Sequence, residues 1–247
     1  MRDVTVTFLG SGDAFGSGGR LETCLLVEGG GQRFLMDCGP SALAGLKKRG
    51  VALSSVGTIL ISHLHGDHFA GIPSFILDGQ FTKRETPLVI AGPPGLVERV
   101  RQAQEVLYPK SSETKQRYPI EFVELEAGIR ARVGPVDVTP YPVVHFCGAV
   151  PYALRVEFNG RTITYSGDTE WTDSLIDAAA GADLFISECY YFDRKVKFHM
   201  DYQSLVAHRD SLTCGRIVLT HMSPDMLSRI QDVRGFDVAA DDMVVTL

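Results

Sequence analysis

Four side chains that can bind a metal ion lie within the six-residue segment His63-Leu64-His65-Gly66-Asp67-His68. One short loop can present several of these donors, so little conformational entropy is lost when they bind a metal. Imidazole nitrogens and carboxylate oxygens together suit zinc and the neighbouring first-row divalent metals. We therefore expect a metal site to be built on this segment.

An apolar, strand-like run followed by a histidine or a carboxylate occurs four times in the chain. The residues that follow these runs are His63, Asp168, Glu188 and His221. Polar residues often begin the loop after a strand, which explains one such case well but four cases poorly. Strands of one sheet deliver the residues that follow them to one edge, where α/β proteins build their sites. We expect the four clusters to meet at such an edge.

The elements that must position these residues alternate between strand and helix patterns. Strands are expected at 4–9, 23–28, 33–36, 58–62, 88–91, 136–139, 152–158, 161–166, 184–187 and 216–220. Helices are expected at 41–49, with Ser41 as the cap, and at 96–108, 174–180 and 202–210. Asn159-Gly160 is the strongest hairpin signal in the chain. Antiparallel strands mixed with returning helices indicate two packed sheets with helices outside, a four-layer α/β fold. We expect one domain over residues 1–247.

The composition is that of an ordinary globular protein. The 247 residues are 45% hydrophobic and 22% charged, with a formal net charge of −6. This acidic balance argues against a protein that coats nucleic acid through a general basic surface. The chain shows no long apolar run and no secretory signal pattern, and its five cysteines are widely spaced without a C-x-x-C pair. These features predict a cytoplasmic protein with reduced thiols and no membrane span.

The segment His63-x-His65-x-Asp67-His68 resembles the defining motif of the metallo-β-lactamase-fold hydrolases. The resemblance extends over essentially the whole chain and implies a four-layer αββα sandwich of two mixed sheets flanked by helices. It also implies two divalent metal ions, most readily Zn²⁺, with Mn²⁺ or Fe²⁺ as alternatives. By this resemblance, the first metal is held by His63, His65 and His145, the second by Asp67, His68 and His221, and Asp168 bridges them. Histidine at position 65, where the di-iron redox relatives carry glutamate, favours hydrolysis.

Further segments resemble the ribonuclease Z branch of this superfamily. These are residues 8–12, 92–96 and 199–204. In that branch, the counterpart of His199, supported by a carboxylate such as Glu188, is thought to give a proton to the leaving oxygen. A metal-bridging hydroxide would attack the phosphodiester, since two metals about 3.5–4 Å apart lower the pKa of bound water toward roughly 7. The catalytic candidates are therefore Asp67, His199 and Glu188.

One feature of ribonuclease Z is missing. Only 23 residues separate His145 from Asp168, which leaves no room for the long tRNA-clamping arm of that branch. A small anionic or phosphodiester substrate is therefore favoured, and tRNA 3′-end processing is disfavoured. A lactone, ester or thioester hydrolase of the same fold is the main alternative, and a non-catalytic scaffold is disfavoured because no ligand is lost. Homodimerisation is expected from the resemblance alone.

The basic segment 83–118 has two interpretations. It holds seven lysine and arginine side chains that could attract an anionic substrate to the mouth of the pocket. A solvated helical excursion with no contact to substrate is the favoured interpretation.

Overall fold

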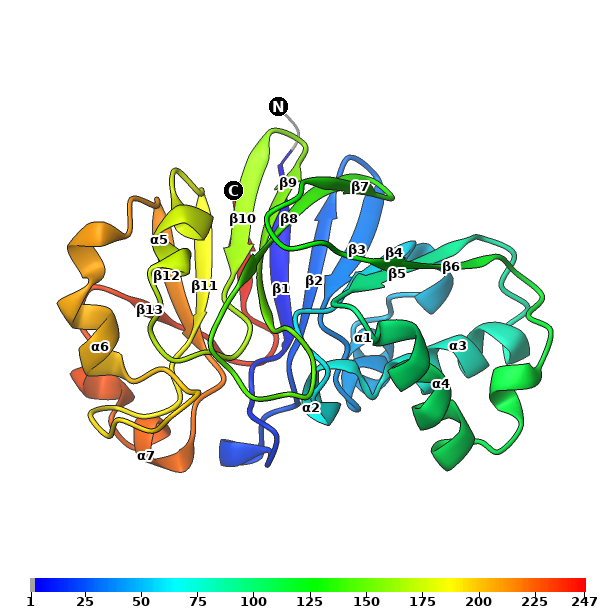
Figure 1. Ribbon diagram of the computed structural model, residues 1–247, viewed down its shortest axis with the longest axis horizontal. Helices are drawn as coiled ribbons and strands as arrows, with labels where there is room; N and C mark the ends of the chain where they lie inside the picture. Colours follow the sequence, from blue (N-terminus) through cyan, green and yellow to red (C-terminus); the bar gives the residue numbers. More distant parts are fainter. Residues whose placement is uncertain (1–2) are drawn as a thin grey trace.

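Two mixed β-sheets form the centre of the computed structural model, which describes residues 3–247 (Figure 1). The first sheet has the strand order β14-β1-β2-β3-β4-β5-β6. The pairs β14–β1, β1–β2 and β2–β3 are antiparallel, whereas the pairs from β3 to β6 are parallel. Its strands are β1 (Thr5–Gly10), β2 (Cys24–Gly29), β3 (Gln32–Met36), β4 (Thr58–Leu60), β5 (Leu88–Gly92), β6 (Ile120–Glu124) and β14 (Val244–Thr246).

The second sheet has the strand order β13-β12-β11-β10-β9-β8-β7. The expected hairpin joins β9 to β10, and Asn159 and Gly160 have φ angles of 50° and 78°. Positive φ at both turn residues is what a type I′ turn requires, which explains why this dipeptide predicts the hairpin. The strands are β7 (Ala131–Val133), β8 (Val136–Pro142), β9 (Tyr152–Phe158), β10 (Arg161–Tyr165), β11 (Leu184–Glu188), β12 (Arg216–Thr220) and β13 (Asp237–Val238).

Helices cover the outer faces of both sheets, so the expected four-layer arrangement is confirmed (Figure 1). One apolar core lies between the sheets and includes Phe34, Phe158 and Tyr165. A second core lies under α1 (Ala42–Lys48), α3 (Ile72–Phe81) and α4 (Leu96–Leu107), beside the short α2 (Gly66–Phe69). A third lies under α5 (Ser174–Ala179), α6 (Tyr202–Ala207) and α7 (Pro224–Leu227). Among the described residues, no helix is both long enough and apolar enough to span a bilayer.

Two local features differ from the expectations. Ser41 occupies the N-cap position of α1, but its hydroxyl accepts a hydrogen bond from the backbone of Glu22 at 3.0 Å instead of capping the helix. Because the Ser41 hydroxyl is bonded to the loop before β2, α1 begins without a hydrogen bond from a side-chain cap. Helix α3 and strands β6 and β7 were not expected from the sequence.

Candidate metal centre

The strand ends bring the predicted ligands together, but from two sheets instead of one. His63 lies three residues beyond β4 of the first sheet, and α2 then carries Asp67 and His68. Asp168 and His221 follow β10 and β12 of the second sheet. The carboxyl ends of these strands meet where the two sheets face each other, so a single sheet edge was the wrong expectation.

The first group of ligand atoms belongs to three histidines. One ring nitrogen from each of His63, His65 and His145 lies within 4.8 Å of the others. Nε2 of His145 is 2.9 Å from Nδ1 of His65, and His63 is fully buried. Three imidazoles converging at this distance match a site for one divalent metal ion.

The second group combines two carboxylates with two histidines, all within 4.8 Å of one another. Asp67 Oδ2 lies 3.1 Å from Nε2 of His68 and 3.2 Å from Nε2 of His221. Asp168 lies between the two groups, because its Oδ1 is 3.4 Å from His68 Nε2 and its Oδ2 is 3.9 Å from His63 Nε2. Its carboxylate is therefore placed as a bridging ligand would be.

Several of these ligand atoms are buried without a hydrogen-bond partner. Buried polar atoms of this kind are expected where a metal ion binds, so they show whether the residues fit a metal site. The unpartnered atoms include Nε2 of His63, Nε2 of His68 and Oδ1 of Asp168. Burying such groups without partners costs free energy, so they are rarely left alone in a folded protein. Nitrogen and oxygen donors aimed at one another suit a first-row divalent metal. The residues therefore fit the two-metal site that the sequence resemblance implies.

Burial and neighbouring charges act in opposite directions on these groups. Burial lowers the pKa of His63 well below its ordinary value, and the nearby His68 lowers it further. Burial also lowers the pKa of His221, but the charge of Asp168 and the hydrogen bond to Asp67 outweigh it and raise this pKa to about 9. A metal ion that binds His221 would therefore have to displace a proton from it.

Asp37 supports the centre from outside and was missed by the sequence analysis. Its carboxylate accepts a hydrogen bond from Nδ1 of His68 at 2.7 Å and two more from the backbone and hydroxyl of Ser62, both at 2.8 Å. Fixing Nδ1 as the donor turns Nε2 of His68 toward the ligand cluster. Asp37 directly follows β3, so the same strand-end pattern that selected His63 could have found it.

The first glycine-rich loop positions His221. The carbonyl of Ser11 accepts hydrogen bonds from the backbone N–H of His221 at 3.1 Å and from the hydroxyl of Thr220 at 3.3 Å. A Cβ at Gly10 would lie 1.9 Å from the carbonyl oxygen of Glu22. Only glycine allows this approach, and this is the structural use of the segment at residues 8–12.

Glu188 and His199 form a hydrogen-bonded pair at the edge of the second group. Nδ1 of His199 is hydrogen-bonded to Oε1 of the fully buried Glu188. Oε2 of Glu188 accepts hydrogen bonds from the backbone of Thr169 at 2.8 Å and of Met200 at 3.1 Å. Burial lowers the pKa of His199, but the hydrogen bond and charge of Glu188 outweigh it, so that this pKa is raised.

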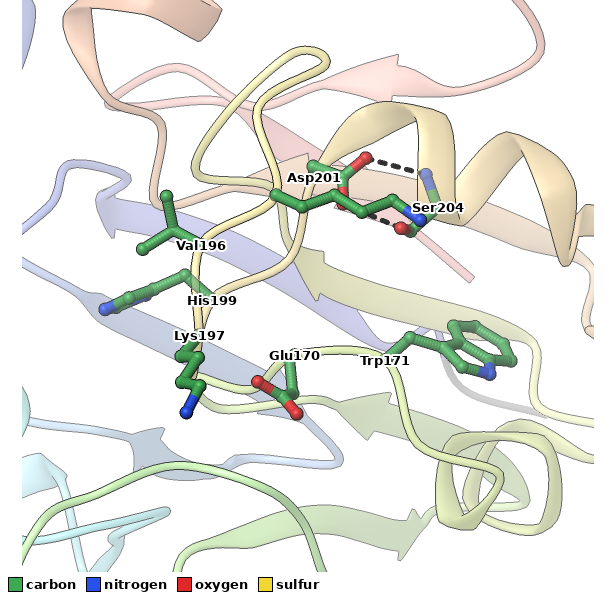
Figure 2. Close-up of a pocket in the computed structure, with 8 residues that line it drawn as sticks. Glu170, Trp171, Val196, Lys197, His199, Asp201 and Ser204 are labelled. Atoms are coloured by element: carbon green, nitrogen blue, oxygen red, sulfur yellow. Dashed lines mark hydrogen bonds between the residues drawn. The ribbon is translucent and has the colours of Figure 1, made fainter.

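A cavity of about 320 Å³ opens beside His199. Figure 2 shows His199 at one end of it and Trp171 at the other, with Glu170 between them. Lys195 and Lys197 add positive charge to the lining. Of the proposed site residues, His199 alone is part of the lining of this cavity.

The basic segment 83–118 spreads over α4, β5 and the turns around them, where one of its cations has a structural role. The guanidinium of Arg84 is buried and donates hydrogen bonds to the backbone carbonyls of Leu53, Val56, Thr86 and Pro87. Arg84 is therefore a structural cation.

Comparisons with known proteins agree with this fold. The ribonuclease Z of Mycobacterium bovis (strain BCG / Pasteur 1173P2) is 30% identical over 250 residues, covering 90% of this chain and 86% of that protein. The metallo-β-lactamase fold protein YhfI of Bacillus subtilis has a TM-score of 0.80 at 24% identity, with full coverage of both chains. Human tRNase Z, short form, has a TM-score of 0.77 at 24% identity, with 98% of each chain covered.

Fold, ligand cluster and relatives together define a metal-dependent hydrolase of the ribonuclease Z-like, metallo-β-lactamase-fold class. The family described as "Anti-Pycsar protein Apyc1" matches residues 4–241. The chain belongs to this family.

Proposed function

We propose that the chain is a dinuclear metal-dependent phosphodiesterase in which His199 donates a proton to the leaving oxygen. The observation that carries this proposal is the Glu188–His199 pair beside the double ligand cluster. A general acid helps most when the leaving group is a poor alkoxide, as in an unactivated phosphodiester. An acyl hydrolase needs oxyanion stabilisation more than such an acid, so the pair favours phosphodiester cleavage.

The ligand groups assign one role to each side chain. We propose that His63, His65 and His145 hold one divalent cation, that Asp67, His68 and His221 hold the other, and that Asp168 bridges them. Two cations so placed would activate a water molecule and neutralise charge on the phosphate oxygens. Zn²⁺ is the proposed metal, because a nitrogen-rich ligand group suits it better than Mg²⁺ or Ca²⁺.

The short connection between His145 and Asp168 limits the substrate. It contains the hairpin of β9 and β10, and every residue of both strands pairs within the second sheet. The longest stretch outside these strands is 146–151, which is too short for an arm that clamps a folded RNA. We therefore propose a small phosphodiester as substrate and disfavour tRNA.

Metal content and a substrate panel test the proposal together. The purified protein is expected to contain about two equivalents of zinc per chain and to hydrolyse small linear and cyclic phosphodiesters. The panel also includes a lactone, a thioester and a tRNA precursor. Strong lactone turnover without phosphodiester turnover would favour the acyl hydrolase instead.

A further inference from the structure

Two phenylalanine rings stand exposed beside the ligand cluster. Phe146 directly follows His145 and is 75% exposed, and Phe198 directly precedes His199 and is 37% exposed. Their ring centroids are 6.3 Å apart with an angle of 36° between the planes. Phe198 also meets His145 edge-on at 6.5 Å. The ring of Phe198 therefore borders the proposed metal ligand His145, and the ring of Phe146 lies beside that of Phe198.

The backbone of Phe198 is held in a conformation that bulky residues avoid. Its φ is 73°, in the left-handed region. Glu170 accepts a hydrogen bond from its N–H at 2.8 Å, and its carbonyl accepts one from Nδ1 of His145, also at 2.8 Å. Glu170 is visible beside His199 in Figure 2. A strained residue fixed from both sides at an active centre suggests a functional reason for its orientation.

Ordinary packing does not explain the ring of Phe146. A phenyl group that is three-quarters exposed gains little from burial, and neither ring belongs to the three apolar cores. Two exposed rings side by side present π-faces on which a flat ring can stack. Their position continues directly from the ligand cluster, so a molecule bound there can reach them.

We propose that Phe146 and Phe198 form an aromatic wall that binds a planar ring of the substrate, on the side of the leaving oxygen. Placing this ring on the leaving-group side of the phosphate rests on the proposed function, since His199 would protonate the leaving oxygen. A group attached to this oxygen lies next to Phe198, the residue before the acid. The aromatic wall would thus select phosphodiesters whose leaving group carries a planar ring.

The test compares two ligands that differ only in the flatness of one ring. Benzylphosphonate and cyclohexylmethylphosphonate are titrated calorimetrically into the zinc-loaded protein. The benzyl compound is expected to bind about three- to tenfold more tightly, because aromatic pairs gain this much beyond area burial. The preference should disappear in Phe146→Ala and in Phe198→Gly, where glycine accepts the positive φ and keeps the carbonyl.

Phe81→Ala is the matched control. Phe81 is 80% exposed at the end of α3, away from the ligand cluster, so this variant should keep the preference. Equal affinities in the unaltered protein, no binding of either phosphonate, or a preference that survives in both wall variants would overturn the proposal. Binding is measured without turnover, so an intact preference without phosphodiester hydrolysis would overturn the proposed reaction alone.

Discussion

The buried carboxylate of Glu188 accepts a hydrogen bond from Nδ1 of His199. The same oxygen lies 3.6 Å from Nδ1 of His221, one of the proposed metal ligands. Because the other oxygen is held by two backbone N–H groups, the carboxylate cannot turn away. Glu188 therefore orients the proposed acid through a hydrogen bond. It acts on the proposed ligand His221 only through its charge, because 3.6 Å is too long for a hydrogen bond.

His199→Ala tests the acid role through the leaving group. If His199 protonates the leaving oxygen, an unactivated alkyl phosphodiester should lose about 10²- to 10⁴-fold in kcat, whereas a 4-nitrophenyl diester should lose far less. His208→Ala is the matched control, because His208 stacks on Trp171 at 3.9 Å and does not contact the cluster. Equal losses on the two substrates would show that His199 is not the acid.

Glu188→Gln should move the alkaline limb of the pH–rate profile to lower pH. Burial lowers the pKa of His199, and Glu188 raises it above the ordinary value. The acid must be protonated, so activity falls as pH rises through this raised pKa. Glutamine keeps the shape but removes the charge, so the pKa of His199 falls and the limb follows it downward. The pH–rate profiles of the unaltered protein and of Glu188→Gln are measured with the unactivated diester. An alkaline limb at the same pH in both would contradict the role of Glu188.

Most of the proposed ligands could be selected from the sequence because their signals are local. Four donors lie within one six-residue segment, and Asp168 and His221 follow strand patterns that the sequence shows directly. His145 was expected only from the family resemblance. The four-layer fold follows from alternation of strands and helices along the chain. Which sheet each strand joins is a long-range property, and this is why one shared edge was expected where two sheets meet.

The position of Asp37 after a strand is a local signal, but its role is not, and α3 has no clear local signal. The role of Asp37 depends on the parallel pairing of Met36 with Leu60, which places the residues after β3 and β4 side by side. Helix α3 contains Gly79, a weak helix former. Its Cα packs so close to Tyr118 that a Cβ would lie 2.6 Å from the hydroxyl oxygen and 2.7 Å from the ring. Tertiary packing therefore stabilises α3 although Gly79 lowers its local helix propensity.

Asp37→Asn is expected to weaken zinc binding by about 10- to 100-fold, since partners that orient a metal-binding imidazole are worth this much. Asparagine can present its amide N–H₂ group to Nδ1 of His68, so the preferred tautomer is no longer enforced. Competition with a chromogenic chelator gives the affinity. Asp78→Asn is the control, because its ion pair with the exposed Lys47 lies on the surface. An unchanged affinity in Asp37→Asn would contradict the positioning role.

Zinc binding should release protons, and its affinity should rise with pH. Burial lowers the pKa of His221, but Asp168 and Asp67 raise it to about 9 in the metal-free protein, so this imidazole is protonated at neutral pH. A cation can bind Nε2 only after that proton leaves, and protons therefore compete with the metal. Raising the pH toward about 9 removes the competitor and tightens binding.

Calorimetric titration with zinc in two buffers of different protonation enthalpy counts the released protons. Near neutral pH, zinc binding should release at least about one proton per chain, and the His221→Ala variant should release fewer protons. A pH-independent affinity with no proton release would mean that the metal-free centre holds its histidines neutral, contrary to the ion pairs of His221 with Asp67 and Asp168.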